Sequence, residues 1–131
     1  MTHMKTFGPA PIGPAGNPIP LSAAIETNGL VFLSGQIAMV DGTVPGGIAE
    51  QTDRIFTSMA DVLAEAGLTL DNVAKVTVWL CDPADFAAFN AVYLKRLKPP
   101  YPARSCVISQ LVLANARVEI EAIASRANMR R

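Results

Sequence analysis

Hydrophobic residues along this chain recur with two periods, one typical of strands and one typical of helices. Five runs rich in apolar, β-branched or aromatic residues predict strands, at 21–26, 30–38, 73–81, 104–110 and 116–124. Asn28-Gly29 separates the first two runs and is a strong hairpin signal. Gly35 interrupts the second run, which predicts either a β-bulge where a ligand or another backbone comes close, or simply a packing glycine.

Two further segments repeat at helical spacing. Residues 48–66 place their apolar side chains at steps of three and four, and Gly67 follows where a helix C-terminus favours glycine. A second helix is predicted from about 82 to 97. Asp82 is suited to the N-cap of that helix and Pro83 to its first turn.

The predicted order of elements is β-β-α-β-α-β-β, which favours an α+β fold. We expect a two-layer sandwich in which two helices cover one face of a mixed β-sheet. A length of 131 residues indicates one domain. Prolines and glycines punctuate residues 1–20, so this segment is predicted to be an extended arm and 21–131 to form the domain. The other sheet face is more apolar than water favours, which suggests either a subunit interface or a monomer with a rich core.

Composition excludes several classes of function. Hydrophobic residues make up 50% of the chain, and Lys+Arg and Asp+Glu number 11 each, so the net charge is zero. This balance argues against a nucleic-acid partner, which requires clustered positive charge. Three arginines gather near the C-terminus, Arg126, Arg130 and Arg131, and are expected to lie in a solvated tail. Neither a signal peptide nor a membrane-spanning stretch is recognisable, which predicts a cytoplasmic protein with no membrane partner.

Metal binding and histidine-dependent catalysis are not expected. Cys81 and Cys106 lie in apolar runs, and neither has a second Cys or His at metal-ligand spacing. Both are predicted to stay reduced. The single histidine, His3, lies in the arm, so a Ser-His or Cys-His nucleophile is not expected either.

The candidate chemistry lies in the last two predicted strands. Arg104 stands at the start of one, and the other carries Glu119 and Glu121 on alternate positions. If these strands form a hairpin, a register that sets Arg104 opposite either glutamate keeps the charges on one face. The arginine could then grip a carboxylate, and a glutamate could orient or deprotonate a water. The alternative is an ordinary Arg–Glu ion pair, and residue types alone do not decide between the two.

Several motifs, taken together and in order, resemble the RidA family, also called the YjgF family. They are LVFLSGQI at 30–37, EQT at 50–52, VLAEAG at 62–67, VAKVTV at 73–78, DFAAFNAVY at 85–93, PARS at 102–105 and VEIEAIA at 118–124. The resemblance covers roughly 21–124. It implies a chorismate-mutase-like fold and a homotrimer with clefts between subunits. It also implies hydrolysis of 2-imino or enamine acids to 2-keto acids and ammonia, without metal or cofactor.

The resemblance also implies roles for individual residues. Arg104 matches the arginine that grips the substrate carboxylate, and Glu119 the glutamate associated with the attacking water. Gly35 matches the glycine whose backbone lines the pocket, and Cys106 the cysteine beside it. One position departs from the pattern, because many members carry a tyrosine where this chain has Leu21.

Three functions are therefore compared. The first is an enamine or imine deaminase acting on a small carboxylate substrate. The second is a non-catalytic trimer that binds a carboxylate metabolite between subunits, which the change at Leu21 motivates. The third is an RNA-cleaving translation inhibitor, a name this family has carried. The neutral charge and the absence of a histidine outside the arm argue against this third function.

Overall fold

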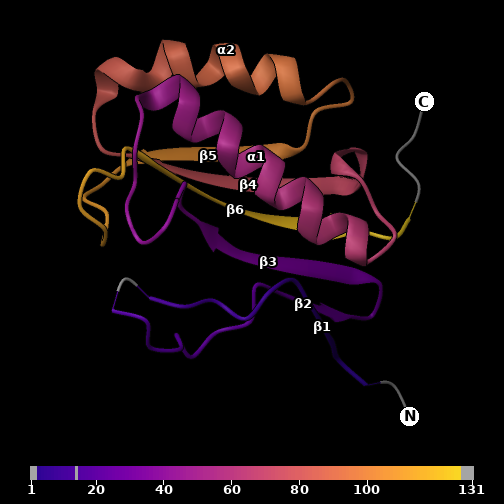
Figure 1. Ribbon diagram of the computed structural model, residues 1–131. Helices are drawn as coiled ribbons and strands as arrows, with labels where there is room; N and C mark the ends of the chain where they lie inside the picture. Colours follow the sequence, from indigo (N-terminus) through magenta and orange to yellow (C-terminus); the bar gives the residue numbers. More distant parts are fainter. Residues whose placement is uncertain (1–2, 14, 128–131) are drawn as a thin grey trace.

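The computed structural model describes residues 3–13 and 15–127, and it shows two helices packed on one face of a six-stranded sheet (Figure 1). The predicted α+β two-layer sandwich is confirmed. In chain order the elements are β1 (Lys5–Phe7), β2 (Ala24–Thr27), β3 (Leu30–Gln36), α1 (Ile48–Glu65), the 3₁₀ turn η1 (Leu70–Asn72), β4 (Val73–Leu80), the 3₁₀ turn η2 (Pro83–Asp85), α2 (Phe86–Arg96), β5 (Ala103–Ile108) and β6 (Val118–Ser125).

The order of strands in the sheet is β1-β2-β3-β6-β4-β5. Strands β4 and β5 run parallel, joined through α2, and all other neighbours are antiparallel, so the sheet is mixed as predicted. The predicted hairpin of the last two strands is wrong. The crossover through α2 brings the chain back parallel to β4 and leaves β5 at the edge of the sheet. Strand β6 instead enters between β3 and β4.

The N-terminal part of the sheet contains one confirmed feature and one that was not predicted. Asn28 and Gly29 both have positive φ, 52° and 77°, as a tight hairpin turn between β2 and β3 requires. Strand β1 was not predicted, because its three residues are too few for a periodic signal. It pairs with β2 along the outer edge of the sheet, where the neighbouring glycines and prolines are tolerated.

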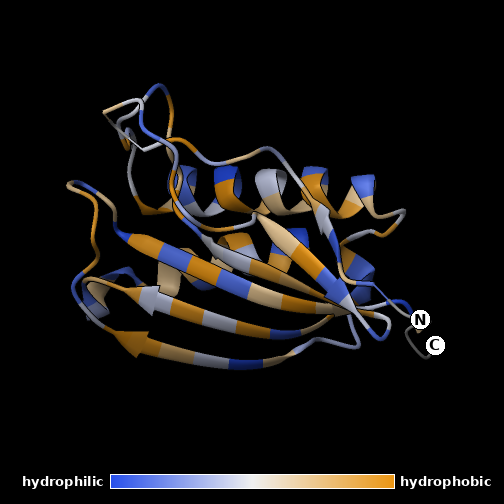
Figure 2. Ribbon diagram, turned by 90° about the horizontal axis from the view of Figure 1, so that it is seen from below, coloured by the Kyte–Doolittle hydropathy of each residue, from blue (hydrophilic) through white to orange (hydrophobic). Residues whose placement is uncertain are grey.

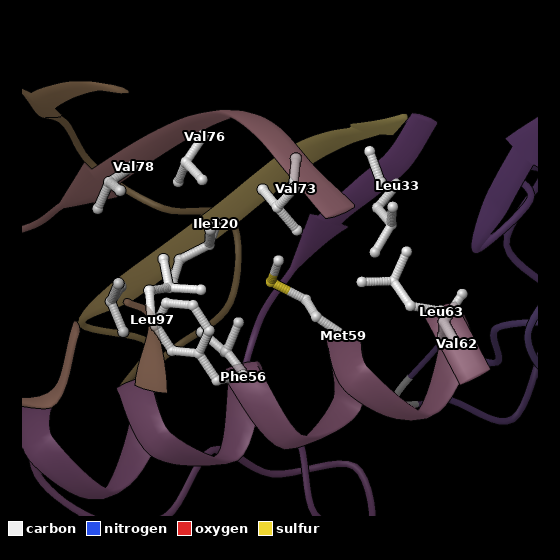
Figure 3. Close-up of a cluster of buried hydrophobic side chains, with 14 of the residues drawn as sticks. Leu33, Phe56, Met59, Val62, Leu63, Val73, Val76, Val78, Leu97 and Ile120 are labelled. Atoms are coloured by element: carbon white, nitrogen blue, oxygen red, sulfur yellow. The ribbon is translucent and has the colours of Figure 1, made fainter. Parts of the chain in front are cut away.

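The core lies between the helices and the sheet (Figure 3). Phe56, Met59 and Leu63 project from α1 and are completely buried against strand residues such as Val76 and Ile120. Burying each such side chain contributes about 1.5–3 kcal/mol. Burial alternates along β3, β4 and β6, so every second side chain of these strands packs into this core. Hydrophobic and hydrophilic residues are interspersed along the sheet (Figure 2).

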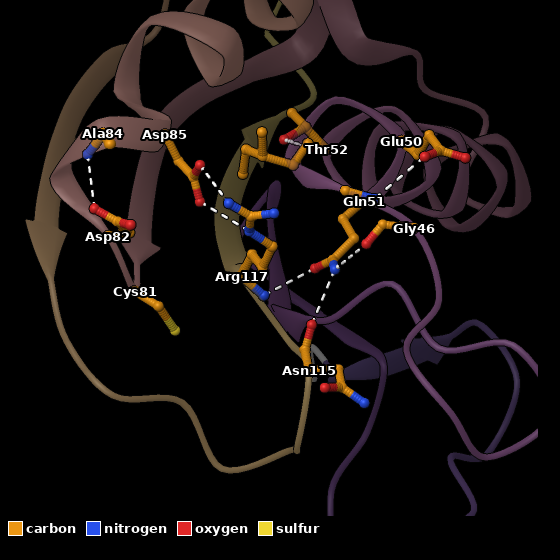
Figure 4. Close-up of polar contacts among 12 residues, drawn as sticks. Gly46, Glu50, Gln51, Thr52, Cys81, Asp82, Ala84, Asp85, Asn115 and Arg117 are labelled. Atoms are coloured by element: carbon orange, nitrogen blue, oxygen red, sulfur yellow. Dashed lines mark hydrogen bonds and ion pairs between the residues drawn. The ribbon is translucent and has the colours of Figure 1, made fainter.

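A polar network joins the start of α1 to the start of β6 (Figure 4). Gln51 is fully buried, and its Nε2 donates to the carbonyls of Gly46 and Asn115 at 2.9 and 3.0 Å. Its Oε1 accepts from the Arg117 backbone N–H at 2.8 Å. The Arg117 guanidinium donates to both carboxylate oxygens of Asp85, at 2.7 and 3.0 Å. Arg117 is therefore part of the scaffold that fixes the first residues of β6.

Three arginines near the C-terminus were expected to lie in a solvated tail. Arg126 lies within the described residues, and it forms an ion pair instead. Arg126 donates to both carboxylate oxygens of Glu26, at 2.5 and 2.9 Å, and so connects the end of β6 to β2. Arg130 and Arg131 lie outside the described residues.

Candidate functional site

Arg104 and Glu119 point to opposite faces of the sheet. Arg104 pairs with Val76, which in turn pairs with Ala122, so these three residues share the face beneath the helices. Glu119 pairs with Trp79 and stands three residues from Ala122 along β6, which places its side chain on the other face. Among the described residues no ion pair joins them. Within one chain the predicted Arg–Glu contact is wrong, both as an ion pair and as a complete site.

The Arg104 guanidinium is held by neutral groups only. Its Nη1 donates to Asn90 Oδ1 at 2.8 Å, and its Cζ lies over the rings of Tyr93, Phe89 and Phe86 at 4.7, 5.7 and 5.8 Å from their centroids. Ring faces attract a cation without neutralising it. No acidic side chain of the described residues pairs with this arginine. The arrangement fixes a positive charge that remains free to bind an anion.

The spacing of the α2 residues around Arg104 reveals that they share a helix face, but not that they position this arginine. Phe86, Asn90 and Tyr93 recur at steps of four and three, so they lie on one helix face. The apolar periodicity of this segment favours a core position for Phe86, but 43% of its surface is exposed. Asn90 has no role that its position in the sequence reveals, because the strand that it faces cannot be identified from the chain order alone.

A cavity of about 350 Å³ opens beside Arg104. Its lining also includes Tyr93, Leu94, Tyr101 and Pro102. The Tyr93 hydroxyl is buried without a hydrogen-bond partner in the described residues, and burial raises the pKa of this tyrosine while the Arg104 charge opposes the rise. The cavity thus combines the Arg104 cation and the Asn90 amide with aromatic and apolar walls, behind which the Tyr93 hydroxyl is buried.

Glu119 lies in a second, larger groove of about 510 Å³, which does not include Arg104. Burial raises the pKa of Glu119, and the nearby negative charge of Glu121 raises it further. No hydrogen bond or ion pair to Glu119 is found among the described residues. A half-buried carboxyl group without a partner is suited to exchange a proton with a bound molecule.

Gly35 stands against Glu119, which explains why this strand position lacks a side chain. The β3–β6 register shifts between Leu33 and Gln36, so the predicted bulge is confirmed. A Cβ at position 35 would overlap with Oε2 of Glu119 and lie 3.1 Å from its Cδ. Gly35 and Glu119 therefore share the wall of the groove. The group that comes close to this glycine is the Glu119 side chain, where the prediction named a ligand or another backbone.

The rest of the groove is mostly apolar and is formed by several segments, of which the N-terminal segment is one. Leu21, which is 47% exposed, faces it from the chain just before β2. Its other large apolar side chains are Ile12, Ile19, Ile37, Met39, Val62, Val112 and Leu113. The ionisable groups in its lining are Asp61, Glu65 and Glu119, which are all acidic.

Cys106 is placed beside Arg104 but borders neither cavity. It stands two residues further along β5, on the same face, and is partly buried against the core. Burial raises the pKa of its thiol, with the Arg104 charge opposing the rise, so the thiol stays protonated at neutral pH. Both cysteines are free. In the described part of the chain, no group of three His, Cys, Asp or Glu side chains could hold a metal ion.

The sequence matches one protein-family model and several known proteins. The family model described as Endoribonuclease L-PSP matches residues 15–126. Protein mmf1, mitochondrial, of Schizosaccharomyces pombe is 41% identical over 109 residues, covering 80% of this chain and 67% of that protein. The 2-iminobutanoate/2-iminopropanoate deaminase of Bos taurus is 37% identical over 119 residues, covering 88% and 82%.

Solved structures share the fold. The crystal structure of RidA from the Antarctic bacterium Psychrobacter sp. PAMC 21119 superposes with a TM-score of 0.81 at 29% identity, covering 92% of this chain and 98% of that one. A helix long and apolar enough to cross a membrane is not found in the described part of the chain. The predicted cytoplasmic location stays a prediction, since one of these relatives is named as mitochondrial. The motifs, the fold and these relatives agree, and the chain belongs to the RidA family.

Proposed function

We propose that this protein is an enamine/imine deaminase, which hydrolyses a 2-imino acid, or the enamine that tautomerises to it, to a 2-keto acid and ammonia. The observation that carries the proposal is the guanidinium of Arg104, which is fixed at the mouth of a cavity and lacks an acidic partner among the described residues. A bidentate guanidinium is well matched to the carboxylate of such a substrate. The deaminase name of the bovine relative supports the same reaction.

The complete site is proposed to form between protomers of a homotrimer. Arg104 and Glu119 lie on opposite faces of the sheet and in separate cavities, so one chain cannot bring both to one small molecule. A head-to-tail ring would place the Arg104 edge of one protomer against the Glu119 groove of the next. The open sheet face supports such contacts, because it exposes the apolar side chains of Leu30, Phe32 and Val107.

The proposed chemistry needs positioning and one proton-transfer group. Arg104 binds the substrate carboxylate, which fixes C2 of the imine, an electrophilic carbon. The Glu119 carboxylate accepts a proton from water as the water oxygen bonds to C2 and the π electrons of C2=N move to nitrogen. Protons then pass to the nitrogen, the C2–N bond breaks, and ammonia leaves as C2=O forms. Holding water and imine together supplies most of the acceleration.

The direct test is release of ammonia and 2-keto acid from freshly generated 2-aminoacrylate or 2-iminobutanoate. We expect the two products in equal amounts, at a rate proportional to protein concentration and above the spontaneous rate. A rate that stays at the spontaneous level over this range would contradict the proposal.

Glu121→Gln is expected to shift the acid limb of activity to lower pH. Glu119 must be ionised to accept a proton, so activity falls as pH drops through its pKa, which lies above the ordinary value of 4.5. Removing the Glu121 charge lowers that pKa and extends activity into more acidic solution. The measurement is kcat/KM against pH. Asp71→Asn, which removes the partly exposed carboxylate that pairs with Lys98 at η1, is the control and should leave the fall in activity at acidic pH where it is.

Gly35→Ala is expected to lower kcat/KM roughly 100-fold, because the new Cβ displaces the Glu119 carboxylate. The obstructing atom is the end of a flexible side chain, so the free energy of unfolding should change by less than about 1 kcal/mol. Gly47→Ala is the matched control, since a Cβ there meets nothing within 4 Å. Equal loss of activity in both variants, measured beside urea unfolding, would argue against a role for Gly35 at the site.

A binding protein without turnover is the second candidate. Leu21 favours it, because this position offers no hydroxyl to the groove that holds Glu119. Thermal stabilisation by a 2-keto acid, lost in Arg104→Ala and unaccompanied by hydrolysis of any imine, would support this second candidate. Cleavage of RNA is disfavoured by the acidic lining of the groove, which repels phosphates.

A further inference from the structure

The cavity beside Arg104 needs more hydrogen-bond donors than the arginine alone supplies. The oxygens of a carboxylate offer about four acceptor sites, and a bidentate guanidinium fills about two of them. Arg104 in addition spends an N–H of Nη1 on Asn90 Oδ1, at 2.8 Å. An acceptor that stays unpaired in a site closed to water weakens binding. We therefore expect further donors in the lining of this cavity.

Two side chains of the lining can supply these donors. Leu94 and Pro102 have no side-chain donor, and the Tyr93 hydroxyl is buried behind the wall. Asn90 uses its Oδ1 as an acceptor, and its Nδ2 has no hydrogen-bond partner among the described residues, so this amide can donate. The remaining donor of the lining is the hydroxyl of Tyr101.

The chain presents Tyr101 on a stiff stretch of backbone. This residue lies in the sequence Pro99-Pro100-Tyr101-Pro102, which connects α2 to β5. Proline fixes its own φ and confines the residue before it to extended conformations, so Pro102 restricts the backbone of Tyr101. Tyr101 is 48% exposed, and its hydroxyl has no hydrogen-bond partner among the described residues. A ligand in the cavity can therefore take this hydroxyl as a donor.

The proposed assembly brings this hydroxyl into the shared site. Tyr101 and Arg104 line one cavity, next to the edge strand β5, and in the ring the Glu119 groove of the next protomer covers that edge. Excluding water there strengthens a hydrogen bond to a charged acceptor. Tyr101 thus stands in the same half of the site as Arg104, on the same protomer.

We propose that the Tyr101 hydroxyl donates a hydrogen bond to the substrate carboxylate beside Arg104, which makes Tyr101 a further substrate-binding residue. This inference rests on the proposed function, because it takes the carboxylate to lie on Arg104. The carboxylate does not react, so its contacts are equally strong in the bound substrate and in the transition state. Removing such a contact raises KM and leaves kcat nearly unchanged.

The experiment compares the wild type with Tyr101→Phe, which removes the hydroxyl and keeps the ring. On freshly generated 2-iminobutanoate we expect KM to rise roughly 10-fold, with kcat changed less than about twofold. The Kd of 2-ketobutanoate, measured by isothermal titration calorimetry, should rise by the same factor. Thr6→Val removes an exposed hydroxyl from β1, outside both cavities, and is the control that should leave KM and Kd unchanged.

The contrary results can be told apart. Unchanged KM and Kd in Tyr101→Phe, while Arg104→Ala loses binding, would overturn the inference and leave the proposed function standing. A fall in kcat at constant KM would also overturn it, and would assign the hydroxyl to proton transfer. An unchanged Kd with easier dissociation of the oligomer, measured by analytical ultracentrifugation, would mean that the hydroxyl bonds the next protomer. Absence of imine hydrolysis in the wild type would overturn the proposed function, and the Kd of 2-ketobutanoate would still decide whether Tyr101 contacts a carboxylate.

Discussion

Arg104→Ala is expected to lower kcat/KM for imine hydrolysis by about 30- to 1,000-fold. Removing one partner of a hydrogen-bonded charge pair costs about 2–4 kcal/mol, and each 1.4 kcal/mol is a factor of ten. The loss should be large because the described residues offer no second cation in the cavity: its lining contains Arg104 as the single basic group. Steady-state rates on freshly generated 2-iminobutanoate, with folding checked by circular dichroism, measure the effect.

The matched control is Arg96→Ala. Arg96 also lies over an aromatic ring, that of Phe56 at 5.9 Å, but it pairs with Asp53 and borders neither cavity. It should keep nearly full activity. Arg104→Lys should recover only part of the wild-type rate, since a lysine lacks the planar fork and its fit to Asn90 and the rings. Full activity in Arg104→Ala would refute the carboxylate clamp and the proposed mechanism with it.

Mixing two inactive variants should restore activity. Arg104→Ala and Glu119→Gln each remove one half of every site, but in a ring each site takes its arginine from one protomer and its glutamate from the next. After denaturation and refolding of an equal mixture, about one quarter of the interfaces combine an intact Arg104 with an intact Glu119. Activity should therefore rise from the background to about a quarter of the wild-type rate.

The control for this experiment is mixing without refolding, which should give no recovery until subunits exchange. A double variant carrying both changes in one chain, refolded in equal amount with wild type, should also give about one quarter of the wild-type rate, and about one half if both residues act within one chain. If the refolded mixture of single variants stays at background while refolded wild type recovers its activity, the two residues act within one chain or not together. Both explanations would overturn the proposal that the site lies between two protomers.

Local patterns predict most of the elements but not which strands are neighbours. The α1 stripe, the Asn28-Gly29 turn and the bulge at Gly35 follow from short-range preferences of the residues themselves, and the structure confirms them. Strand pairing depends on where a crossover returns the chain, which periodicity does not encode. For that reason the sequence favours Arg104 and Glu119 on adjacent strands, whereas β4 separates β5 from β6.

In the candidate site too, local features can be predicted from the sequence, whereas contacts between distant segments cannot. The residue types at Arg104 and Glu119 allow either a carboxylate clamp with a proton-transfer group or an ordinary ion pair, and the clamp is favoured only by the resemblance of the surrounding motifs to the RidA family. The supporting residues are not predictable in this way, because Asn90 acquires its role only when α2 lies across β5. The contact of Arg117 with Asp85 likewise depends on η2 and β6 meeting in space. Such contacts join distant parts of the chain, and one sequence alone does not reveal them.

The separation of the two cavities has an evolutionary consequence. In the proposed assembly, the group that anchors every substrate is encoded in the C-terminal half of the chain, by β5 and the helix α2 that packs over it. The wall of the groove beside Glu119 is encoded by several other segments, and the N-terminal segment around Leu21 is one of them. Substitutions in that segment can change which metabolite is accepted without disturbing the anchor or its contacts. Proteins of this architecture could then diverge in specificity through a few residues near Leu21 while the catalytic framework stays constant.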